Sequence, residues 1–324
     1  MRPGTVYLLA TSLGDIGIMF VAAVTYAPFL RRIGLTLSEI TLINGVFITL
    51  MVLAQVPTGL FADRYGRALS VKIGIAIVSV FTFAYAWASG FWSALLFEAA
   101  VGIGMAFTSG ADTAWLTSTL DARGERHRLE PTLATAEIVS SLGGLAAGTI
   151  GGLIAAFDPM WTWLVSGTII AMSFVGTVTF MRDTPSEPSS APHHVGRADR
   201  PLHESVALLR RTPALRWAIV HACVFAIVGP CFHYTTIVFG ARVGSFGLAF
   251  LWILIYGPKV IGALAMRVWS VRLANGWGIA TLTAVPFCMG IGLVVLGTAS
   301  SLGFMLIGIA FVEVAFGLGQ PLMA

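Results

Sequence analysis

Long apolar runs recur along this chain of 324 residues, and they limit what it can fold into. A run of about 20 apolar residues, at about 1.5 Å per residue, can cross roughly 30 Å of hydrocarbon as an α-helix. Only 10% of the residues are charged and 57% are hydrophobic, which leaves too little charge to cover the surface of a soluble domain. The sequence therefore predicts an all-α, polytopic membrane protein and argues against a soluble globular enzyme.

Motifs of enzyme and cofactor chemistry are missing from the sequence. We find no zinc-ligand spacing, no phosphate-binding loop and no nucleophile elbow. We therefore expect no enzyme activity, no catalytic residue, no metal and no cofactor. The net charge of +4 does not indicate a nucleic-acid partner, because the basic residues lie between the apolar runs, as in proteins embedded in a lipid bilayer.

Ten apolar segments can be marked, and each predicts one membrane-spanning helix. They cover residues 5–30, 37–61, 70–89, 91–118, 132–156, 160–181, 214–240, 246–271, 277–298 and 302–324. A polar stretch rich in Pro, Ser, His and Arg separates the first six segments from the last four. We expect an N-terminal six-helix bundle at 1–181, a cytoplasmic linker at 182–212 and a C-terminal bundle of about four helices at 213–324.

Arginine and lysine residues are unevenly distributed between the two sides of this topology. With the N-terminus inside, the inner segments hold fifteen of them and the outer loops hold three. Because cytoplasmic loops of membrane proteins are enriched in Lys and Arg, the sequence predicts a multi-pass protein of the cell membrane, of the bacterial inner-membrane type. Its N-terminus is then cytoplasmic.

The stretch PTGLFADRYGR, residues 57–67, joins the second and third segments and carries a tight cluster of charges and glycines. We expect Gly59 to allow a close helix contact and Gly66 to allow a tight turn. Asp63, Arg64 and Arg67 are expected to pair with each other or with the ends of neighbouring helices. The stretch is then a cytoplasmic gating loop. The alternative is that its positive charge only anchors the cytoplasmic side.

Three charged residues lie at similar depths inside apolar segments: Asp15, Lys259 and Glu313. Ionisable groups in hydrocarbon are unfavourable unless they are paired or hydrated. We hypothesise that one or both acids hold Lys259 charged and that protonation of an acid accompanies substrate movement. The alternative is an ion pair that only fixes helix packing. Trp252 and Tyr256 lie on the same helix face as Lys259 and form either an aromatic wall for a substrate or part of the core.

The fourth segment has a stripe of polar and small residues at helical spacing. Glu98, Met105 and Asp112 belong to this stripe, which is typical of a helix that lines a water-filled cavity. In the first segment, Tyr26 lies on the same face as Asp15. These residues are therefore candidates for the substrate and proton pathway.

Asp112 has a second interpretation, which it shares with Glu137 of the fifth segment. Both acids lie near the inner ends of their segments, close in sequence to the arginines at 123–128. They are therefore also candidates for simple ion pairs with those arginines.

The residues Gly59, Asp63, Arg64, Gly66 and Arg67, which follow a Pro-Thr pair, resemble the signature loop of the major facilitator superfamily. The stretch SGADTAWL, late in the fourth segment, is similar to one found in bacterial members. This resemblance implies a secondary transporter of two pseudo-symmetric bundles that moves a small organic molecule by alternating access. The central cavity would be lined by helices that include the first, fourth and tenth. A proton gradient is the implied energy source, and export is the implied direction.

Members of that family usually have twelve helices, so the resemblance implies that the last two are absent here and that a further C-terminal segment or a partner chain supplies them. A different class of function therefore stays open. The chain is then a non-transporting or fragmentary membrane protein that acts as a sensor, a scaffold or a partner subunit.

Overall fold

The computed structural model describes most of the first half of the chain and parts of the second. The described residues are 1–22, 25–183, 247, 249–250, 252–254, 256–262, 287–292, 294–295, 298 and 301–319. The predicted segment 214–240 and almost all of the predicted linker lie outside these residues.

Every regular element within the described residues is helical, which agrees with the predicted all-α class. The helices are α1 (Pro3–Ala10), α2 (Ser12–Ala22), α3 (Tyr26–Arg32), α4 (Leu37–Tyr65), α5 (Arg67–Tyr85), α6 (Phe91–Thr108), α7 (Ala111–Ala122), the short η1 (Arg126–Arg128), α8 (Leu129–Phe157), α9 (Pro159–Phe180) and α13 (Leu302–Gly319). Further helical residues occur within 247–262 and 287–298.

Six of these stretches are long and apolar enough to cross a membrane. They are Pro3–Ala22, Leu37–Tyr65, Arg67–Tyr85, Phe91–Ala122, Arg126–Phe157 and Pro159–Phe180. The six predicted spans of the first half are thereby confirmed. They are helical because hydrocarbon offers no partner to backbone N–H and C=O groups, which a helix satisfies internally.

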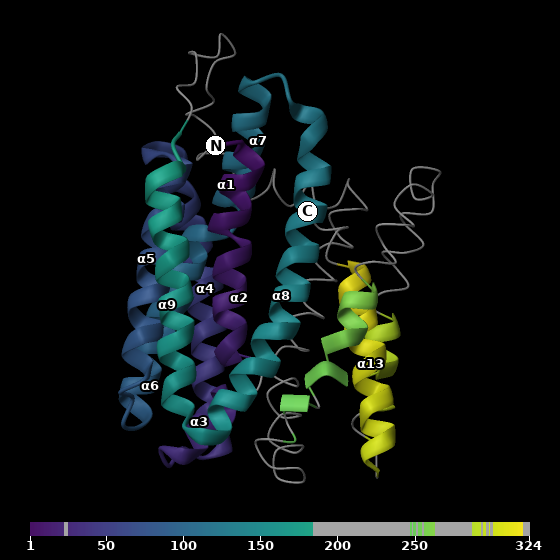
Figure 1. Ribbon diagram of the computed structural model, residues 1–324. Helices are drawn as coiled ribbons and strands as arrows, with labels where there is room; N and C mark the ends of the chain where they lie inside the picture. Colours follow the sequence, from purple (N-terminus) through teal and green to yellow (C-terminus); the bar gives the residue numbers. More distant parts are fainter. Residues whose placement is uncertain are drawn as a thin grey trace, which may run out of the picture.

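Helix α8 lies at the boundary between the two halves (Figure 1). Helices α1, α2, α4, α5, α6 and α9 stand side by side, and α13 lies on the far side of α8 together with the other helical residues of the second half. The Trp252 indole N–H donates to the Gly144 carbonyl of α8 at 3.3 Å, which joins the two halves directly.

The fourth span is broken where the sequence predicted one continuous helix. Helix α6 ends at Thr108, and Gly110 follows with a φ of +76°, a value that residues with a side chain rarely adopt. A new helix, α7, begins at Ala111, so that Asp112 lies in the first turn of a helix and not in the middle of one. The glycine supplies the physical reason for the break.

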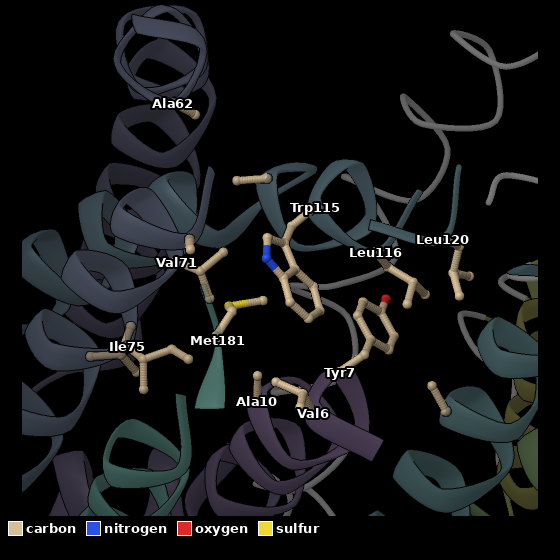
Figure 2. Close-up of a cluster of buried hydrophobic side chains, with 14 of the residues drawn as sticks. Val6, Tyr7, Ala10, Ala62, Val71, Ile75, Trp115, Leu116, Leu120 and Met181 are labelled. Atoms are coloured by element: carbon tan, nitrogen blue, oxygen red, sulfur yellow. The ribbon is translucent and has the colours of Figure 1, made fainter. Parts of the chain in front are cut away.

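Buried side chains form two apolar clusters, one at each end of the first bundle. The first cluster packs α1, α5, α7 and the residues after α9 together, with Trp115 and Met181 near its centre (Figure 2). The second cluster lies at the other end, where the Tyr85 ring stacks on Trp163 with centroids 4.0 Å apart. Together they hold the six spans as one unit.

The turn between α8 and α9 carries a cap that gives stability a defined pH dependence. Asp158 accepts a hydrogen bond from the Met160 N–H at 3.0 Å and a second from Arg32, also at 3.0 Å. The backbone hydrogen bond and then the Arg32 charge lower the pKa of Asp158. Because the folded-state pKa lies below the unfolded value of about 3.9, the stabilisation is present above that pH and is lost as the pH falls through the folded-state pKa.

Asp158→Ala is therefore expected to lower the melting temperature modestly at about pH 7, and the difference from the wild type should shrink below about pH 4. Thermal melts of detergent-solubilised protein over this range provide the measurement. Asp121→Ala is the matched control, because Asp121 is also exposed and pairs with an arginine, Arg126 at 2.6 Å, but caps no helix start. A melting difference that stays constant down to low pH would contradict the capping role.

Candidate functional site

Charged side chains from both halves of the chain meet at α8. The Nζ atom of Lys259 lies 4.0 Å from the Glu137 Oε1 atom of α8 and donates to the Tyr256 hydroxyl at 3.0 Å. Lys259 is also within electrostatic range of Asp15 and Glu313. The structure thus brings Asp15, Lys259 and Glu313 together and adds Glu137 to them. We call these four residues the central charge cluster.

The four members of the central charge cluster differ in burial. The Lys259 side chain is 14% exposed and that of Glu137 is 26% exposed, and Glu313 is buried on α13. Asp15 is exposed although it lies in the middle of the first span, and it accepts a hydrogen bond from Ser140 at 3.0 Å. One carboxyl of the cluster is therefore open to solvent-sized molecules while another is enclosed, which suits a group of charges that exchange partners.

The aromatic residues beside Lys259 join the two halves. Trp252 stacks on Tyr256 with ring centroids 4.8 Å apart, and both side chains are buried. The Tyr256 hydroxyl lies 3.0 Å from the point that a Cβ would occupy on Gly144, so glycine at this position admits the ring. In this conformation the two rings form a packed contact with α8.

Asp112 lies near Asp15 of the central charge cluster and near Tyr7 of α1. Its Oδ1 atom accepts from the Thr113 N–H at 2.6 Å, and it is within electrostatic range of Tyr7 and Asp15. Tyr7 shares a hydrogen bond of 3.4 Å with the Thr113 hydroxyl. The half-buried Asp112 carboxyl is thus a neighbour of both Asp15 and Tyr7.

The simpler interpretation of Asp112 and Glu137, as partners of the loop arginines, is not what the structure shows. Arg126 pairs with Asp121 at 2.6 Å, and Arg128 pairs with Glu125 at 3.5 Å. Glu137 instead pairs with Lys259.

Glu98, Tyr26 and Met105 are not placed with the central charge cluster. Glu98 is 9% exposed and lies inside the first bundle. Met105 packs against the first apolar cluster. On the same stripe, a Cβ at Gly102 would come within 2.9 Å of the Phe47 carbonyl oxygen of α4. These positions of the fourth span thus pack on their neighbours, and the expectation that the stripe lines a water-filled cavity stays a prediction.

The loop between α4 and α5 is held by the residues that follow α9. Gly66 has a φ of +109°, so the predicted tight turn is present and needs glycine. The Asp183 Oδ1 atom accepts from the Ala68 N–H at 3.0 Å, at the start of α5. Arg67 donates to the Ala114 carbonyl oxygen at 2.8 Å, which is a contact with a neighbouring helix of the kind that the sequence predicted.

The other residues of the signature stretch are exposed. No atom of the described residues comes within 4 Å of a Cβ at Gly59, so the close helix contact predicted there is absent from this part of the structure. Asp63 is exposed, and the Arg64 guanidinium lies 5.3 Å from the centre of the Tyr65 ring. Within the described ranges Asp63 forms no ion pair with either arginine, contrary to one of the predicted arrangements.

Three interactions were not predicted from the sequence. They are the ion pair of Glu137 with Lys259, the hydrogen bond from the Ser140 hydroxyl to Asp15, and the hydrogen bond from the start of α5 to Asp183. Glu137, Ser140 and Gly144 lie three and four residues apart on α8 and therefore share a face. That spacing predicts a helix face on which polar side chains lie next to a glycine, where another helix can approach closely. The described residues hold no group of three or more His, Cys, Asp or Glu side chains that suits a metal ion.

Six apolar spans and an ion pair that joins them to the described part of the second half indicate a multi-pass membrane protein. The sequence profile of the Major Facilitator Superfamily matches residues 7–324. The chain therefore belongs to the Major Facilitator Superfamily, whose members are membrane transporters and not enzymes.

Two curated relatives match parts of the chain. One is a probable vesicular acetylcholine transporter-A from Danio rerio, 32% identical over 108 residues, which are 33% of this chain and 20% of the relative. The other is an uncharacterized MFS-type transporter, YdeG, from Bacillus subtilis (strain 168), 28% identical over 169 residues, which are 51% of this chain and 38% of the relative. The matched segments thus span well under half of either relative.

The fold is also found among solved structures. The crystal structure of the nucleoside transporter NupG superposes with a TM-score of 0.70 at 12% identity, and the match covers 98% of this chain and 80% of that one. At this identity the likeness establishes the fold alone. The partner chain considered for the missing helices finds no support in these comparisons.

Proposed function

We propose that this chain belongs to a secondary active transporter that moves a small organic molecule across the membrane by alternating access, coupled to protons. Membership of the superfamily supports the transport part of this proposal. The proton coupling is supported by the central charge cluster, in which the half-buried Lys259 of the second half lies beside Glu137 of α8.

The physical argument rests on what the ion pair does when the two halves move. An ammonium and a carboxylate that are largely shielded from water stabilise each other as long as they stay together, and separating them leaves two poorly compensated charges. A proton on a nearby carboxyl, or a substrate that binds Lys259, removes this penalty. Binding of a proton or a substrate at the cluster therefore changes the relative stability of two states, one in which α8 contacts the second half and one in which it does not.

Asp15 is the residue through which protons and substrate are proposed to enter the cluster. It is exposed, is bonded to Ser140 of α8, and lies within electrostatic range of both Asp112 and Lys259. Discontinuous helices beside a site near the membrane midplane are a recurrent feature of carriers, and the break at Gly110 places Asp112 at such a helix start.

The finer parts of the proposal rest on the sequence. The distribution of arginine and lysine supports a cytoplasmic N-terminus in a cell membrane. The polar stretch 182–212 supports a division into a six-helix bundle and a second bundle of about four helices. The α4–α5 loop is then a cytoplasmic gate, because Asp183 and Arg67 connect it to α9 and α7. Export is proposed because this loop and the SGADTAWL stretch resemble those of bacterial exporters.

Purified full-length protein in sealed vesicles with an imposed pH gradient tests the proposal. A panel of organic cations, anions, sugars and nucleosides is added in turn, together with acetylcholine, which the name of one relative suggests. We expect at least one compound to collapse the pH gradient in a protein-dependent way. The Asp15→Asn variant should lose this response, and Glu130→Gln, which removes an exposed acid at the start of α8, should keep it.

Two results would count against the proposal. If Asp15→Asn matches the wild type in rate and in pH dependence, the central charge cluster does not couple protons to transport. If no compound of the panel moves in either direction although the protein is folded, a sensor or scaffold is the better explanation.

A further inference from the structure

A cavity lies at the end of the first bundle where α1 begins and where the chain passes from α7 into α8 (Figure 1). Its volume is about 380 Å³, which is within the range of small-molecule sites in proteins. We call it the α1–α8 cavity. Its polar lining consists of Arg2, Thr5, Glu125, Arg128, Thr132 and Thr135. None of the four members of the central charge cluster lines it, so the cavity is a separate place in the fold.

The lining offers more hydrogen-bond donors than it uses. Among the described residues, the Arg2 guanidinium has no hydrogen-bond or ion-pair partner, and neither have the hydroxyls of Thr5 and Thr132. Thr135 differs, because its hydroxyl donates to the Pro131 carbonyl oxygen at 2.7 Å. A guanidinium carries five N–H donors and a hydroxyl carries one O–H donor. The free donors of Arg2, Thr5 and Thr132 therefore suit a ligand with several acceptor oxygens.

The charges of the lining favour an anion. Arg128 pairs with Glu125 at 3.5 Å, and both side chains are open to solvent, so this ion pair contributes little and can exchange partners. Arg2 and Arg128 together with Glu125 leave one net positive charge. Arg126 of η1 does not line the cavity and is paired with Asp121 at 2.6 Å. An anion is therefore attracted by Arg2 and can replace Glu125 as the partner of Arg128.

Helices α1 and α8 touch at the cavity. A Cβ on Gly4 would lie 3.2 Å from both the Oγ1 and the Cγ2 atoms of Thr132, so glycine at this position lets the Thr132 side chain reach the α1 backbone. Arg2 directly precedes α1, and Arg128 directly precedes α8. A ligand that is held by both arginines therefore connects the starts of two helices that are already in contact.

We propose that the α1–α8 cavity binds a phosphate group, carried by a small soluble compound or by a lipid headgroup. A phosphate monoester has three terminal oxygens and up to two negative charges, and the planar fork of a guanidinium matches its geometry. Arg2 and Arg128 supply the positive charge, while Thr5 and Thr132 supply further donors. Binding makes and breaks no covalent bond, and it stabilises the contact between α1 and α8. The site goes beyond the proposed transport function and does not depend on it.

Inorganic phosphate is the first probe of the site. Purified full-length protein in a neutral detergent is melted at increasing phosphate concentrations, with chloride added to hold the ionic strength constant. Because a ligand that binds only the folded state stabilises it by mass action, we expect the melting temperature to rise with phosphate and then to level off. Butyl phosphate should act at lower concentrations, because its carbon chain can contact Leu8 and Leu120, which form an apolar side of the cavity.

Variants test whether the phosphate binds in this cavity. Arg2→Gln and Arg128→Gln each remove one charged partner, and each should raise the phosphate concentration that gives half of the maximal shift about tenfold or more. Thr132→Val keeps the shape of the side chain and removes its hydroxyl, so it should raise that concentration by between about twofold and tenfold. Arg126→Gln is the matched control, because Arg126 belongs to the same short helix η1 but does not line the cavity. Its response should equal that of the wild type.

A second set of melts distinguishes a lipid headgroup from a soluble phosphate compound. The same proteins are placed in nanodiscs of phosphatidylcholine with or without phosphatidic acid, whose headgroup is a phosphate monoester. A rise in melting temperature with phosphatidic acid alone, lost in Arg2→Gln and Arg128→Gln, assigns the site to a lipid. A rise with the soluble phosphates alone assigns it to a soluble compound, and a rise with both supports the phosphate chemistry that they share.

Two results overturn the proposal. One is a wild-type melting temperature that responds to neither phosphate nor phosphatidic acid. The other is a response that Arg126→Gln weakens as much as Arg2→Gln and Arg128→Gln do, because the binding then depends on general positive charge and not on the cavity. If Arg2→Gln does not fold, Arg128→Gln and Thr132→Val provide the same test. None of these measurements involves transport, so a failure of the proposed function leaves them valid.

Discussion

Lys259→Met is expected to reduce transport at least ~100-fold. Removing one partner of a fully buried ion pair costs about 3–5 kcal/mol. The pair of Lys259 and Glu137 is half-buried, so the lower end of this range applies, and about 1.4 kcal/mol corresponds to a tenfold change. Methionine keeps the length and the apolar stem of the side chain, so the packing against Tyr256 is largely kept. What is lost is the charge that lies beside Glu137 at 4.0 Å and within range of Asp15 and Glu313.

The chain offers a matched control for this variant. It has one other lysine, Lys72, which is half-buried in α5 and is a member of no ion pair found among the described residues. Lys72→Met should transport within about twofold of the wild type, as surface substitutions generally change energies by less than ±0.5 kcal/mol or so. Lys259→Arg retains the charge and should recover part of the activity.

We compare the variants with the wild type by their initial transport rates in vesicles. The rates are measured with an imposed pH gradient and a compound of the panel that the wild type transports. A Lys259→Met protein that transports at the wild-type rate would remove the central charge cluster from the mechanism. A loss in Lys259→Met together with an equal loss in Lys72→Met would indicate damage to folding.

Gly151→Val is expected to destabilise the protein by about 1–3 kcal/mol, the range found when a well-packed contact is overfilled. Gly151 of α8 lies against the Phe20 backbone of α2, and an added Cβ would press on the Phe20 carbonyl group. A backbone carbonyl cannot rotate away as a flexible side chain can, so the two helices must move apart. Small residues at such crossings allow membrane helices to approach closely.

The same substitution should also weaken the site. Helices α2 and α8 carry Asp15 and Ser140, which are joined at 3.0 Å, and pushing the helices apart lengthens this hydrogen bond. The melting temperature in detergent, followed by size-exclusion chromatography after heating, gives the stability effect. Transport by the fraction that remains folded gives the effect on the site.

Gly45→Val is the control for Gly151→Val. Gly45 also lies inside a long helix, α4, but nothing lies within 4 Å of the position of its Cβ. It should melt at or slightly above the wild-type temperature, because valine has a higher helix propensity than glycine. If both variants melt alike, the α2–α8 contact is not as close as the structure shows it.

The spans were predictable because their signal is local. A long apolar run has to be helical in hydrocarbon wherever its neighbours lie, so all six spans of the first half are found in the structure. The first predicted run, 5–30, is the least accurate, because the span ends at Ala22 and its last part falls in the separate helix α3. The tight turn at Gly66 was predictable for the same reason, because a glycine between two spans indicates a turn without reference to the rest of the fold.

The sequence places Asp15, Lys259 and Glu313 at similar positions along their spans, and the structure brings them into one cluster. Position along a span is one coordinate out of three, however. The direction in which a side chain points also depends on how its helix is rotated and on which helix is beside it, so the packing of Met105 against the first apolar cluster could not be predicted from the stripe alone.

The sequence by itself determined the class of fold and the number of spans in the first half, because these depend on the local balance between apolar length and backbone hydrogen bonding. Only the tertiary structure decided the partners: Glu137 for Lys259, Asp183 for the start of α5, and Ser140 for Asp15. Partners are set by close packing between helices far apart in sequence, and helical spacing describes a single helix without naming its neighbour.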